Sequence, residues 1–365
     1  MGQQPRPVRA RRNGGAPVIA VTGAASGAGR AVASRLAASS AVSRVVAIDD
    51  ERGDVEGVSW RVVDITDPSV VSRFSGVDAV VHADVDVGVA TDADQRAQRN
   101  VRGTQTVLTA AAAAGVRRVA VVTSAMVYGA GQDNPIPLDD DAALRAEPDG
   151  SIISDLLEIE DLCARAQRSH PGTEVTVVRP ATLVGPGVDT VLTRHFEAPR
   201  LLVVKGGSPA WQFCHLDDLA AALEHVVVHD LPGPLTVGCD GHLSQSEIEE
   251  LTGRNRVELP ASFVRGTAQR LHRLGLAPVP ASELQFVTYP WVVSAGRLRT
   301  AGWRPSFDNA AAVRAMMDEI DGRHALAARR IGRKETAATI GAAGATVAVL
   351  GTAVAVRRAR RRKRG

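Results

Sequence analysis

Three glycines stand close together near the start of the chain, at positions 23, 27 and 29, between an apolar run that ends at Thr22 and a helix-forming stretch. Glycine lets the backbone turn sharply and lets an anion approach without a Cβ in the way. The free N–H groups and the dipole at a helix N-terminus then hold a phosphate. The pattern indicates a dinucleotide-binding turn. The alternative is a chance grouping in a glycine-rich chain.

An aspartate in the right place supports the first interpretation. Asp49 ends the next apolar run, 20 residues beyond Gly29, where an acid would bind the hydroxyls of the adenosine ribose. Asp50 adds a second negative charge, which should repel a 2′-phosphate. We therefore predict NAD rather than NADP as the cofactor, although Arg30 and Arg52 leave NADP as the alternative. The competing interpretation of Asp49 is a polar residue that merely ends a strand.

The elements that must position these residues alternate along the first half of the chain. We predict strands at 17–22, 44–49, 59–64, 78–83, 117–124 and 174–179, and helices from about 29, at 93–114 and at 152–168. Strands that alternate with helices imply a parallel sheet covered on both faces. The predicted fold class is therefore α/β, a Rossmann-type doubly wound parallel sheet.

The second half of the chain is less regular. Beyond Pro180 prolines and short strands dominate, with a helix at about 217–228. We expect residues 16–180 to form an NAD(P)-binding Rossmann domain and residues 181–322 a smaller substrate-binding lobe over the strand ends.

Charge and cysteine content exclude several classes of function. The net charge of +3 combines +4 in residues 1–15 and +11 in residues 323–365 with −12 in the middle. An acidic body argues against nucleic acid as a ligand. Three widely spaced cysteines argue for a reducing cytosol and against a disulfide framework or a metal site.

The two ends of the chain are expected to differ from the body. Residues 1–15 are expected to be a disordered basic arm, and residues 323–335 a basic linker. Residues 336–356 contain no charge and are followed by the basic tail 357–365. About 20 apolar residues span a bilayer, so we predict a C-terminal hydrophobic membrane helix on a cytoplasmic protein, with an anionic membrane surface as partner of the basic segments. The alternatives are a soluble or interfacial helix and solvated tails.

Eight short sequences resemble, in order, those of the extended short-chain dehydrogenase/reductases, the NAD-dependent epimerase/dehydratase group, and above all its UDP-glucose 4-epimerase-like members. They are Thr22-Gly23…Gly27-Ala-Gly29, Asp64-Ile-Thr-Asp67, Val80-Val-His-Ala83, Asn100-Val-Arg-Gly-Thr104, Thr123-Ser-Ala-Met-Val-Tyr-Gly129, Arg179-Pro180, His215-Leu-Asp-Asp-Leu-Ala220 and Gly302-Trp-Arg-Pro305. The resemblance covers about residues 17–310.

The resemblance implies a role for each matched residue. It places on the cofactor Gly23, Ser26, Gly27, Ala28, Gly29, Asp49, Asp64, Ile65, Val81, His82, Ala83 and Asn100. Among these, Asp64 would reach the adenine amino group with Ile65 beside the ring, and Asn100 would steady the strand ends. Ser124 would be catalytic, through a hydrogen bond to the substrate oxygen.

The chain also departs from the family. Ser26 occupies the place of the middle glycine of the extended members, and Asp84 replaces a small apolar residue, which puts a carboxylate near the diphosphate. The Tyr-x-x-x-Lys pair, expected about 25 residues after Ser124, is missing, because no Tyr or Lys occurs from 130 to 204. Hydride transfer to or from a hydroxyl needs an acid or base within reach, and the usual one is absent.

Substitutes for that pair are few. The acids of helix 152–168 are Asp155, Glu158 and Glu160. The preferred interpretation is that they lie on a solvated face, or that Asp155 packs beside the cofactor. His195 has a suitable ordinary pKa, but a lone histidine is more often structural. The structural interpretation also applies to His215, which lies in a family motif.

Two hypotheses follow. The first is an NAD-dependent epimerase, dehydratase or dehydrogenase with an atypical acid/base, acting on a nucleotide sugar, with sterol-type substrates as the rival class. The second is an inactive NAD-binding regulatory or scaffold protein at the membrane. The family commonly forms homodimers through its two long helices, here 93–114 and 152–168.

Overall fold

A computed structural model describes residues 15–88, 91–264, 266–267 and 281–321, and the backbone at 325–326 and 329–330. Its centre is one seven-stranded sheet with the order β10-β6-β5-β4-β1-β2-β3, and every neighbouring pair is parallel. The strands are β1 (Val18–Thr22), β2 (Arg44–Asp49), β3 (Val58–Val62), β4 (Ala79–His82), β5 (Arg118–Val122), β6 (Glu174–Pro180) and β10 (Leu235–Val237). The predicted doubly wound parallel sheet is confirmed.

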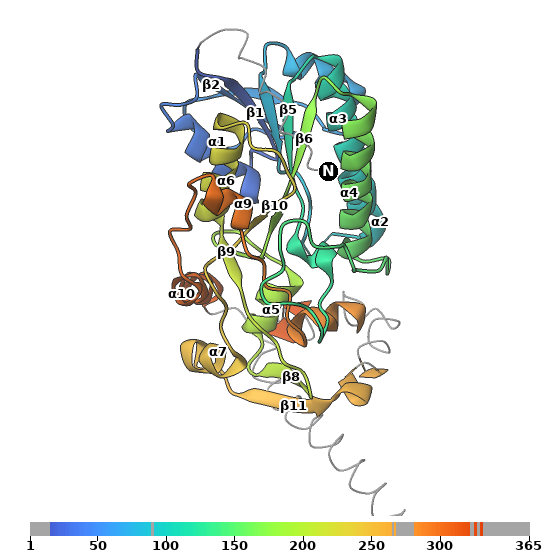
Figure 1. Ribbon diagram of the computed structural model, residues 1–365, viewed down its shortest axis with the longest axis vertical. Coiled ribbons are helices and arrows are strands. Elements are labelled where there is room, and N and C mark those ends of the chain that lie inside the picture. Colours follow the sequence, from blue (N-terminus) through green and yellow to red (C-terminus); the bar gives the residue numbers. More distant parts are fainter. Residues whose placement is uncertain are drawn as a thin grey trace, which may run out of the picture.

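Helices cover both faces of the sheet, as Figure 1 shows. One face carries α1 (Gly27–Ala37), which packs against α6 (Leu216–Val228). The other carries α3 (Gly103–Ala113) and α4 (Ile152–Ser169), which also contact each other. Because both faces are covered, the inner strands are nearly continuous apolar runs, as in Val18-Ile-Ala-Val-Thr22.

The helix predicted at 93–114 is interrupted. It consists of α2 (Ala93–Ala97), a π-helical turn η2 (Gln98–Arg102) and α3. A π-turn inserts one extra residue per turn and often occurs at functional sites. This turn carries Arg99 and Asn100 towards the ends of the strands, a displacement that a helical sequence pattern does not reveal.

The lobe after Pro180 is built of short elements. They are β7 (Thr182–Val184), α5 (Val191–Glu197), β8 (Leu201–Lys205), β9 (Phe213–His215), α7 (Gln245–Thr252), β11 (Arg256–Pro260), η4 (Ala281–Val287), α9 (Gly296–Thr300), α10 (Asn309–Ile320), β12 (Ala325–Leu326) and β13 (Arg329–Arg330). Strands β7 and β9 pair in parallel, as do β8 and β11, and β8 and β11 lie at the end of the molecule away from the large sheet (Figure 1).

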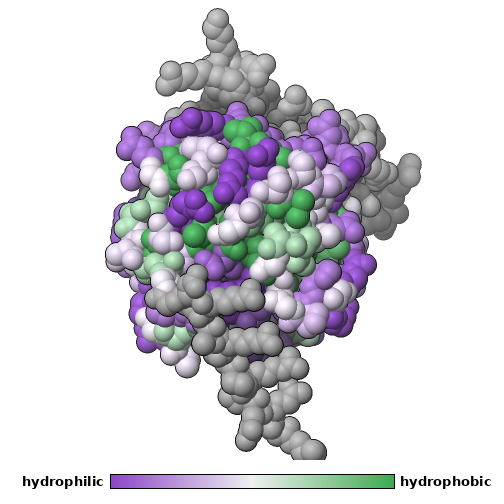
Figure 2. All heavy atoms as spheres, turned by 90° about the horizontal axis from the view of Figure 1, so that it is seen from above, coloured by the Kyte–Doolittle hydropathy of each residue, from purple (hydrophilic) through white to green (hydrophobic). Residues whose placement is uncertain are grey.

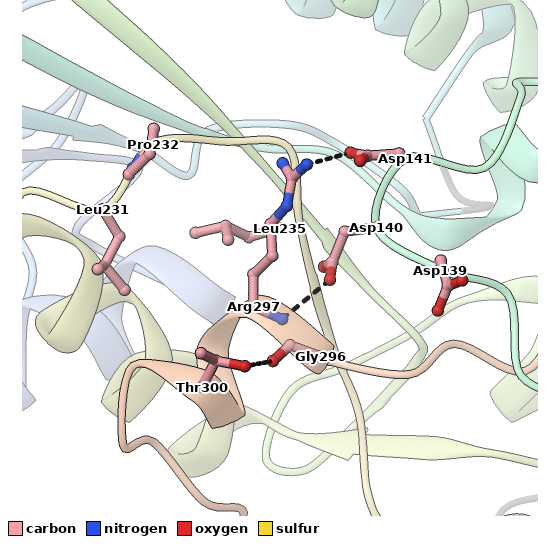
Figure 3. A pocket seen from close by; sticks show the side chains of 9 residues that line it. All are labelled: Asp139, Asp140, Asp141, Leu231, Pro232, Leu235, Gly296, Arg297 and Thr300. Atoms are coloured by element: carbon pink, nitrogen blue, oxygen red, sulfur yellow. Dashed lines mark hydrogen bonds and ion pairs between the residues drawn. The ribbon is translucent and has the colours of Figure 1, made fainter. Parts of the chain in front are cut away.

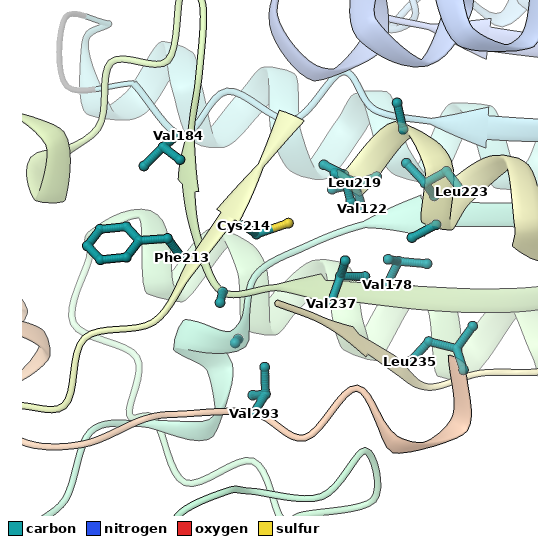
Figure 4. Close-up of a cluster of buried hydrophobic side chains, with 14 of the residues drawn as sticks. Val122, Val178, Val184, Phe213, Cys214, Leu219, Leu223, Leu235, Val237 and Val293 are labelled. Atoms are coloured by element: carbon teal, nitrogen blue, oxygen red, sulfur yellow. The ribbon is translucent and has the colours of Figure 1, made fainter. Parts of the chain in front are cut away.

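The sheet and the lobe share one hydrophobic core. Val122 and Val178 of the large sheet and Phe213 and Val184 of the lobe belong to one buried cluster, which Figure 4 shows. The segment from α6 to β10 also returns to the large sheet after the lobe has begun. The expectation that everything after Pro180 belongs to the lobe is therefore corrected for residues 216–237, whose apolar side chains complete the sheet layer.

The predicted C-terminal segments cannot be compared with this fold. The hydrophobic stretch 336–356 and the tail 357–365 lie outside the described residues, as do 323–324, 327–328 and 331–335 of the linker and the first 14 residues of the basic arm. Within the described part, no helix is long and apolar enough to cross a bilayer. On the face seen in Figure 2, hydrophilic and hydrophobic residues are intermixed.

Candidate active site

The glycine turn joins the end of β1 to the start of α1. Gly23 and Gly27 have φ angles of +71° and +52°, which L side chains rarely adopt. A Cβ at Gly29 would lie 2.0 Å from the carbonyl oxygen of Gly23, so the helix approaches the strand more closely than any other residue allows. A Cβ at Gly27, in contrast, would meet nothing within 4 Å. The turn is therefore closely packed at Gly29, and there is free space at Gly27.

The residues around the glycines leave polar groups available. Ser26 is the N-cap of α1, is exposed, and makes no capping hydrogen bond with its hydroxyl. Ala28 lies in the first turn and is partly buried. A helix N-terminus with uncapped N–H groups attracts anions. The turn thus has the shape and the polarity to hold a phosphate.

Asp49 is built into the same turn. Its carboxylate accepts the backbone N–H of Ala25 at 2.8 Å and that of Asp50 at 2.8 Å. Asp49 is 5% exposed. Burial raises the pKa of Asp49 to about 6, against the effect of the Ala25 hydrogen bond. The end of β2 and the turn after β1 are therefore joined by a carboxylate that still has oxygen lone pairs to offer.

The predicted adenine contacts lie on the other side of β2. Asp64 is exposed, and its carboxylate accepts the backbone N–H of Thr66 at 2.8 Å. Ile65 is 1% exposed, and a Cβ at Gly103 would lie 2.4 Å from its Cδ1. The Ile65 side chain therefore packs into the protein, so that only its backbone remains for an adenine ring.

The strand predicted to run along the cofactor is β4. Val81 and His82 are fully buried, and Ala83 follows the strand. His82 lies between the hydroxyls of Thr22, at 2.7 Å, and Thr104, at 3.0 Å. Burial lowers its pKa to about 4. The neutral ring of His82 therefore ties β1 to β4 and to α3 and does not face a ligand.

Asn100, on the π-turn, fixes the segment after β4. Its side chain accepts the backbone N–H of Asp86 at 2.8 Å and donates to the carbonyl of Asp86 at 3.0 Å. It also donates to the Asp155 carboxylate of α4 at 3.1 Å. Asn100 is fully buried, so it joins the end of β4 to α4 rather than presenting a free amide.

Asp84 does lie against the glycine turn, because a Cβ at Gly23 would fall 2.9 Å from its Cα. Its charge is compensated by Arg99, whose Nη2 lies 3.1 Å from one Asp84 oxygen, while Nη1 donates to Asp50 at 2.8 Å. Burial raises the pKa of Asp84, and Arg99 opposes that rise. Since β1 lies between β2 and β4, this guanidinium spans the end of β1.

These observations test whether a dinucleotide fits. The open space above Gly27 and the N–H groups of the turn suit a diphosphate, and Asp49 suits a ribose diol. Arg99 offsets part of the negative charge of Asp50 and Asp84 at the same place. The residues therefore fit a dinucleotide. Arg30 makes a two-bond ion pair with Asp54, at 2.7 and 2.8 Å, outside this group.

Ser124 begins the short helix η3 (Ala125–Tyr128) after β5. Its Oγ accepts the backbone N–H of Met126 at 3.2 Å, and the residue is partly exposed. A serine hydroxyl that accepts one bond can still donate its own hydrogen. Helix η3 also packs against α4, so Ser124 lies on the side of the sheet where the missing Tyr and Lys were expected.

The acids of α4 already have partners. Asp155 accepts Nε of Arg96 at 2.9 Å, and the exposed Glu158 pairs with Arg165 at 2.7 Å. Glu160 is buried and accepts two bonds from Arg179, at 2.9 and 2.8 Å. None of the three acids offers a free carboxylate near Ser124.

The remaining sequence candidates are structural. His195 is partly exposed and stacks on Trp211, with 5.6 Å between the ring centroids, and desolvation of its ring lowers its pKa to about 4. His215 stacks on Phe307 at 3.9 Å and caps α6 by accepting the N–H of Asp217. The Tyr128 hydroxyl donates to the Asp140 carbonyl at 2.9 Å and accepts from Arg179 at 2.9 Å.

Two residues that the sequence analysis did not single out belong to this region. Arg99 is one, and its position beside Asn100 in a matched motif was the available signal. Glu283 is the other: it lies on η4, is 4% exposed, and has a pKa that burial raises to about 7. No spacing in the sequence links Glu283 to Ser124, because they are 159 positions apart.

A cavity of about 480 Å³ lies elsewhere, beside β10 and α9 (Figure 3). Figure 3 shows that Arg297 contacts two aspartates: Asp140 accepts its backbone N–H at 3.0 Å, and Asp141 forms an ion pair with its guanidinium. The lining contains neither the glycine turn nor Ser124. In the described part of the chain, no group of three or more His, Cys, Asp or Glu side chains could hold a metal ion.

Comparison with known proteins gives a consistent result. The sequence model of the NAD dependent epimerase/dehydratase family matches residues 19–238. "Uncharacterized protein Rv0501" of Mycobacterium tuberculosis is 27% identical over 302 residues, which are 80% of each chain. "Uncharacterized protein y4nG" of Sinorhizobium fredii is 26% identical over 260 residues, 66% of this chain and 62% of that one.

Solved structures agree on the fold. A UDP-galactose 4-epimerase is 22% identical, with a TM-score of 0.60, over 83% of this chain and 98% of that one. The UDP-glucose 4-epimerase of Thermus thermophilus, solved with NAD, is 18% identical, with a TM-score of 0.63, over 84% and 99%. At such identities the likeness concerns the fold alone.

Proposed function

The chain belongs to the NAD dependent epimerase/dehydratase family, and from this premise we propose that it binds NAD at the glycine turn and oxidises and reduces a hydroxyl or keto group of a small molecule. A nucleotide sugar is the proposed substrate class. The observation that carries the proposal is the 2.8 Å hydrogen bond that the Asp49 carboxylate accepts from the backbone N–H of Ala25 in the glycine turn. It sets a ribose-binding acid beside a phosphate-binding helix N-terminus.

The cofactor choice rests on charge. Asp49 ends the strand on which the adenosine ribose would lie and Asp50 follows it, so a 2′-phosphate there would meet two carboxylates. Arg30 is held by Asp54. NAD is therefore favoured over NADP. Related structures support the choice, since the UDP-glucose 4-epimerase of Thermus thermophilus was solved in complex with NAD.

The proposed chemistry assigns one role to each group. NAD, when bound, supplies the acceptor and donor of hydride. Ser124 donates its hydroxyl hydrogen to the substrate oxygen and so orients the carbon that reacts. The glycine turn and Asp49 fix the position of the adenosine half. The acid/base is not the Tyr-x-x-x-Lys pair, which the chain lacks between 130 and 204.

A second candidate function is NAD binding without chemistry, in a regulatory or scaffold protein. It is favoured by the pairing of every acid of α4 that could replace the lost pair, most clearly the two-bond ion pair between Glu160 and Arg179. Such a protein would keep the cofactor as a structural element. The two candidates differ in whether Ser124 affects any measured rate.

The first experiment separates these possibilities. Purified full-length protein is denatured, and the small molecules it releases are identified by mass spectrometry. NAD is expected, and Asp49→Ala should release much less of it. Loaded protein is then mixed with UDP-glucose or UDP-galactose while the absorbance of the reduced nicotinamide is followed. Ser124→Ala should slow that signal by about a hundredfold.

The outcomes are distinct. Protein that neither retains nor binds NAD or NADP would contradict both candidates. Retained NAD with no change of its redox state for any nucleotide sugar or sterol tried would favour the regulatory candidate.

The placement of the protein in the cell is a separate proposal. We propose a cytoplasmic catalytic domain that residues 336–356 attach to a membrane, with the basic tail against anionic lipid. A homodimer through α3 and α4 is proposed by analogy with the family. Both rest on the sequence.

A further inference from the structure

Two buried side chains of opposite charge lie close to the head of α4, where the family's Tyr-x-x-x-Lys pair would begin. Arg96, on α2, is 9% exposed, and Glu283, on η4, is 4% exposed. Both approach α4 from other parts of the chain, one from before Ser124 and one from the C-terminal lobe. Buried charged groups of this kind usually have a full set of partners.

Glu283 is held at this place by its neighbours. The Ser282 hydroxyl donates to the Asp149 carboxylate, directly before α4. Ser151, the N-cap of α4, is close enough to lower the pKa of Glu283. Helix η4 is thus attached to the residues that precede the first turn of α4.

Arg96 approaches the same place along α4. Its Nε donates to Asp155, one turn into α4, at 2.9 Å. Its charge also lowers the pKa of Glu283, and the bonds from Arg96 to Asp155 and from Ser282 to Asp149 bring both groups to the head of α4. However, no nitrogen–oxygen distance within 4.0 Å joins Arg96 to Glu283.

Each of the two side chains keeps one buried atom without a hydrogen-bond partner in the protein. These atoms are Nη2 of Arg96, which is a donor, and Oε2 of Glu283, which is an acceptor. Leaving such atoms unpaired in the protein interior is unfavourable. A hydroxyl group can serve both, because it accepts one hydrogen bond and donates another. A ketone or a carboxylate can serve only the donor.

We propose that Arg96 and Glu283 form a hydroxyl-binding pair at the head of α4, in which Glu283 exchanges a proton with a substrate alcohol and Arg96 stabilises the oxygen. This inference rests on the proposed function, because the alcohol is the group to be oxidised. It gives Glu283 the task of the missing tyrosine and Arg96 that of the missing lysine.

The step assigned to Glu283 is proton transfer alone. The O–H bond of the substrate hydroxyl breaks, and its electron pair stays on the substrate oxygen beside the guanidinium of Arg96. A new O–H bond forms on Oε2 of Glu283. In the reverse direction the protonated Glu283 returns the proton to the same oxygen.

The pKa of Glu283 suits this task. Burial and the Asp149 carboxylate raise the pKa to about 7, against the effects of Arg96 and Ser151. A general acid or base works best when its pKa is near the operating pH. The carboxyl is then half protonated near neutral pH, so it can both accept and donate.

The cavity next to η4 offers an alternative group. It measures about 460 Å³, and its lining includes Asp149, Ser282 and Leu284 together with Tyr289, one of the two tyrosines of the chain. Tyr289 is partly exposed. If the chain used a tyrosine after all, this would be the candidate, and the experiments below separate it from Glu283.

The first experiment needs no substrate. Infrared difference spectra between low and high pH are recorded for the protein loaded with NAD⁺ or with NADH, and for Glu283→Gln. A carboxyl that titrates near pH 7 should be present in the wild type and absent from the variant. Its midpoint should be about one unit lower with NAD⁺, because the positive nicotinamide favours the carboxylate.

Three results would overturn the proposal. The carboxyl band could persist in Glu283→Gln, which would assign it to another residue. The midpoint could be the same with both cofactor forms, which would mean that the pair holds only water away from the reacting ring. The band could also respond equally to Tyr289→Phe.

The second experiment measures turnover of UDP-glucose or UDP-galactose. Glu283→Gln should lower kcat by about a hundredfold or more with little change in KM or in NAD affinity, and Glu283→Asp should restore part of the rate. Glu250→Gln, an exposed acid on α7, is the matched control, and Tyr289→Phe is the test of the alternative. Both should retain the rate.

The failure of this inference is distinguishable from failure of the proposed function. A wild type that turns over either sugar while Glu283→Gln does so equally well refutes the assignment of Glu283 and leaves the proposed function intact. A wild type that binds neither NAD nor NADP refutes both.

Discussion

At the scale of single residues, charge decides whether the dinucleotide site can work. Three carboxylates, those of Asp49, Asp50 and Asp84, lie around the end of β1, where a diphosphate would bring further negative charge. Arg99 contacts the last two and approaches Asp49 to 4.0 Å. A single guanidinium thus makes an otherwise repulsive site tolerable for an anion.

The first prediction concerns this balance. Arg99→Gln should weaken NAD binding about tenfold, because a partly buried carboxylate next to the diphosphate loses its counter-charge. The double variant Arg99→Gln/Asp84→Asn removes the charge of both partners and should recover most of the affinity. Isothermal titration calorimetry with NAD measures the two effects.

Arg30→Gln is the control for that prediction. Arg30 forms an exposed ion pair with Asp54, so its loss should leave NAD affinity unchanged. If Arg99→Gln binds NAD as tightly as the wild type, Arg99 does not compensate the site. If the double variant is as weak as the single one, the effect is not one of charge.

The second prediction concerns pH. Asp49 has a pKa of about 6 in the free protein, raised by burial, and ribose hydroxyls donate to its ionised form. Binding therefore favours the carboxylate, so affinity for NAD is complete well above pH 6 and falls as the pH decreases through about 6, approaching about tenfold per unit at lower pH. Titrations between pH 5 and 8 measure the trend.

Asp49→Asn separates this residue from others that titrate. An amide does not ionise, so the variant should bind weakly at every pH and show no transition near pH 6. A transition that survives in Asp49→Asn would assign the pH dependence elsewhere.

At the scale of elements, the glycine turn works because α1 touches β1. The approach is set at Gly29, where a Cβ would lie 2.0 Å from the Gly23 carbonyl oxygen and 2.9 Å from that of Thr22. Both obstacles are backbone atoms, which cannot turn aside as a side chain can. The N-terminus of α1 therefore stays at this position relative to β1, and to an anion bound in the turn, only while residue 29 has no side chain.

The third prediction tests this contact. Gly29→Ala should lower the free energy of unfolding by about 1–3 kcal/mol and should also weaken NAD binding, because α1 must move away from β1. Gly172→Ala is a matched control, since a Cβ there would meet nothing within 4 Å. Urea denaturation measures both variants. Equal stability of the two would refute the close approach.

The second element that matters is α4. In this chain its inward acids serve packing: Asp155 holds Arg96 and Asn100, and Glu160 holds Arg179 and Thr123. Such buried ion pairs are costly to break because they leave an uncompensated charge. The inward acids of α4 therefore attach this helix to the neighbouring elements. A general acid or base for the proposed reaction would have to come from a different element.

At the scale of the whole molecule, sheet and lobe behave as one packed body. Residues of β5 and β6 lie in the same buried cluster as Phe213, Trp211 and Phe286 of the lobe. Helix η4, which carries Glu283, is thereby held against the head of α4 by a shared core rather than by a linker. The position of a group 159 residues from Ser124 can be exact enough for chemistry on that account.

The fourth prediction concerns the segment beyond this body. Deletion of residues 336–365 should move the protein from the membrane fraction to the soluble fraction, because it removes the 21 uncharged residues and the basic tail. Ultracentrifugation of cell extracts measures the distribution, with NAD binding as the test that the truncated protein is folded. Full-length protein that stays in the supernatant without detergent would refute the anchor.

The sequence by itself determined the order of the first strand, the glycine turn, the first helix and the acid that ends the second strand. Apolar runs, glycines and Asp49 follow one another over a few tens of residues, and local spacing is enough to predict a strand–turn–helix unit and its acid. It also revealed the loss of the Tyr-x-x-x-Lys pair, since an absence of residue types over 130–204 needs no structure. The sheet and the family followed from the same short-range signals.

Only the tertiary structure decided which charges meet. Arg99 reaches Asp50 and Asp84 because β1 lies between β2 and β4. Glu283 and Arg96 both come to the head of α4 because Ser282 of η4 bonds Asp149 and Arg96 bonds Asp155. No periodicity encodes such pairs, since they come from elements far apart in the chain. The physical reason is that burial and neighbouring charge set the state of an ionisable group, and both are properties of the packed molecule.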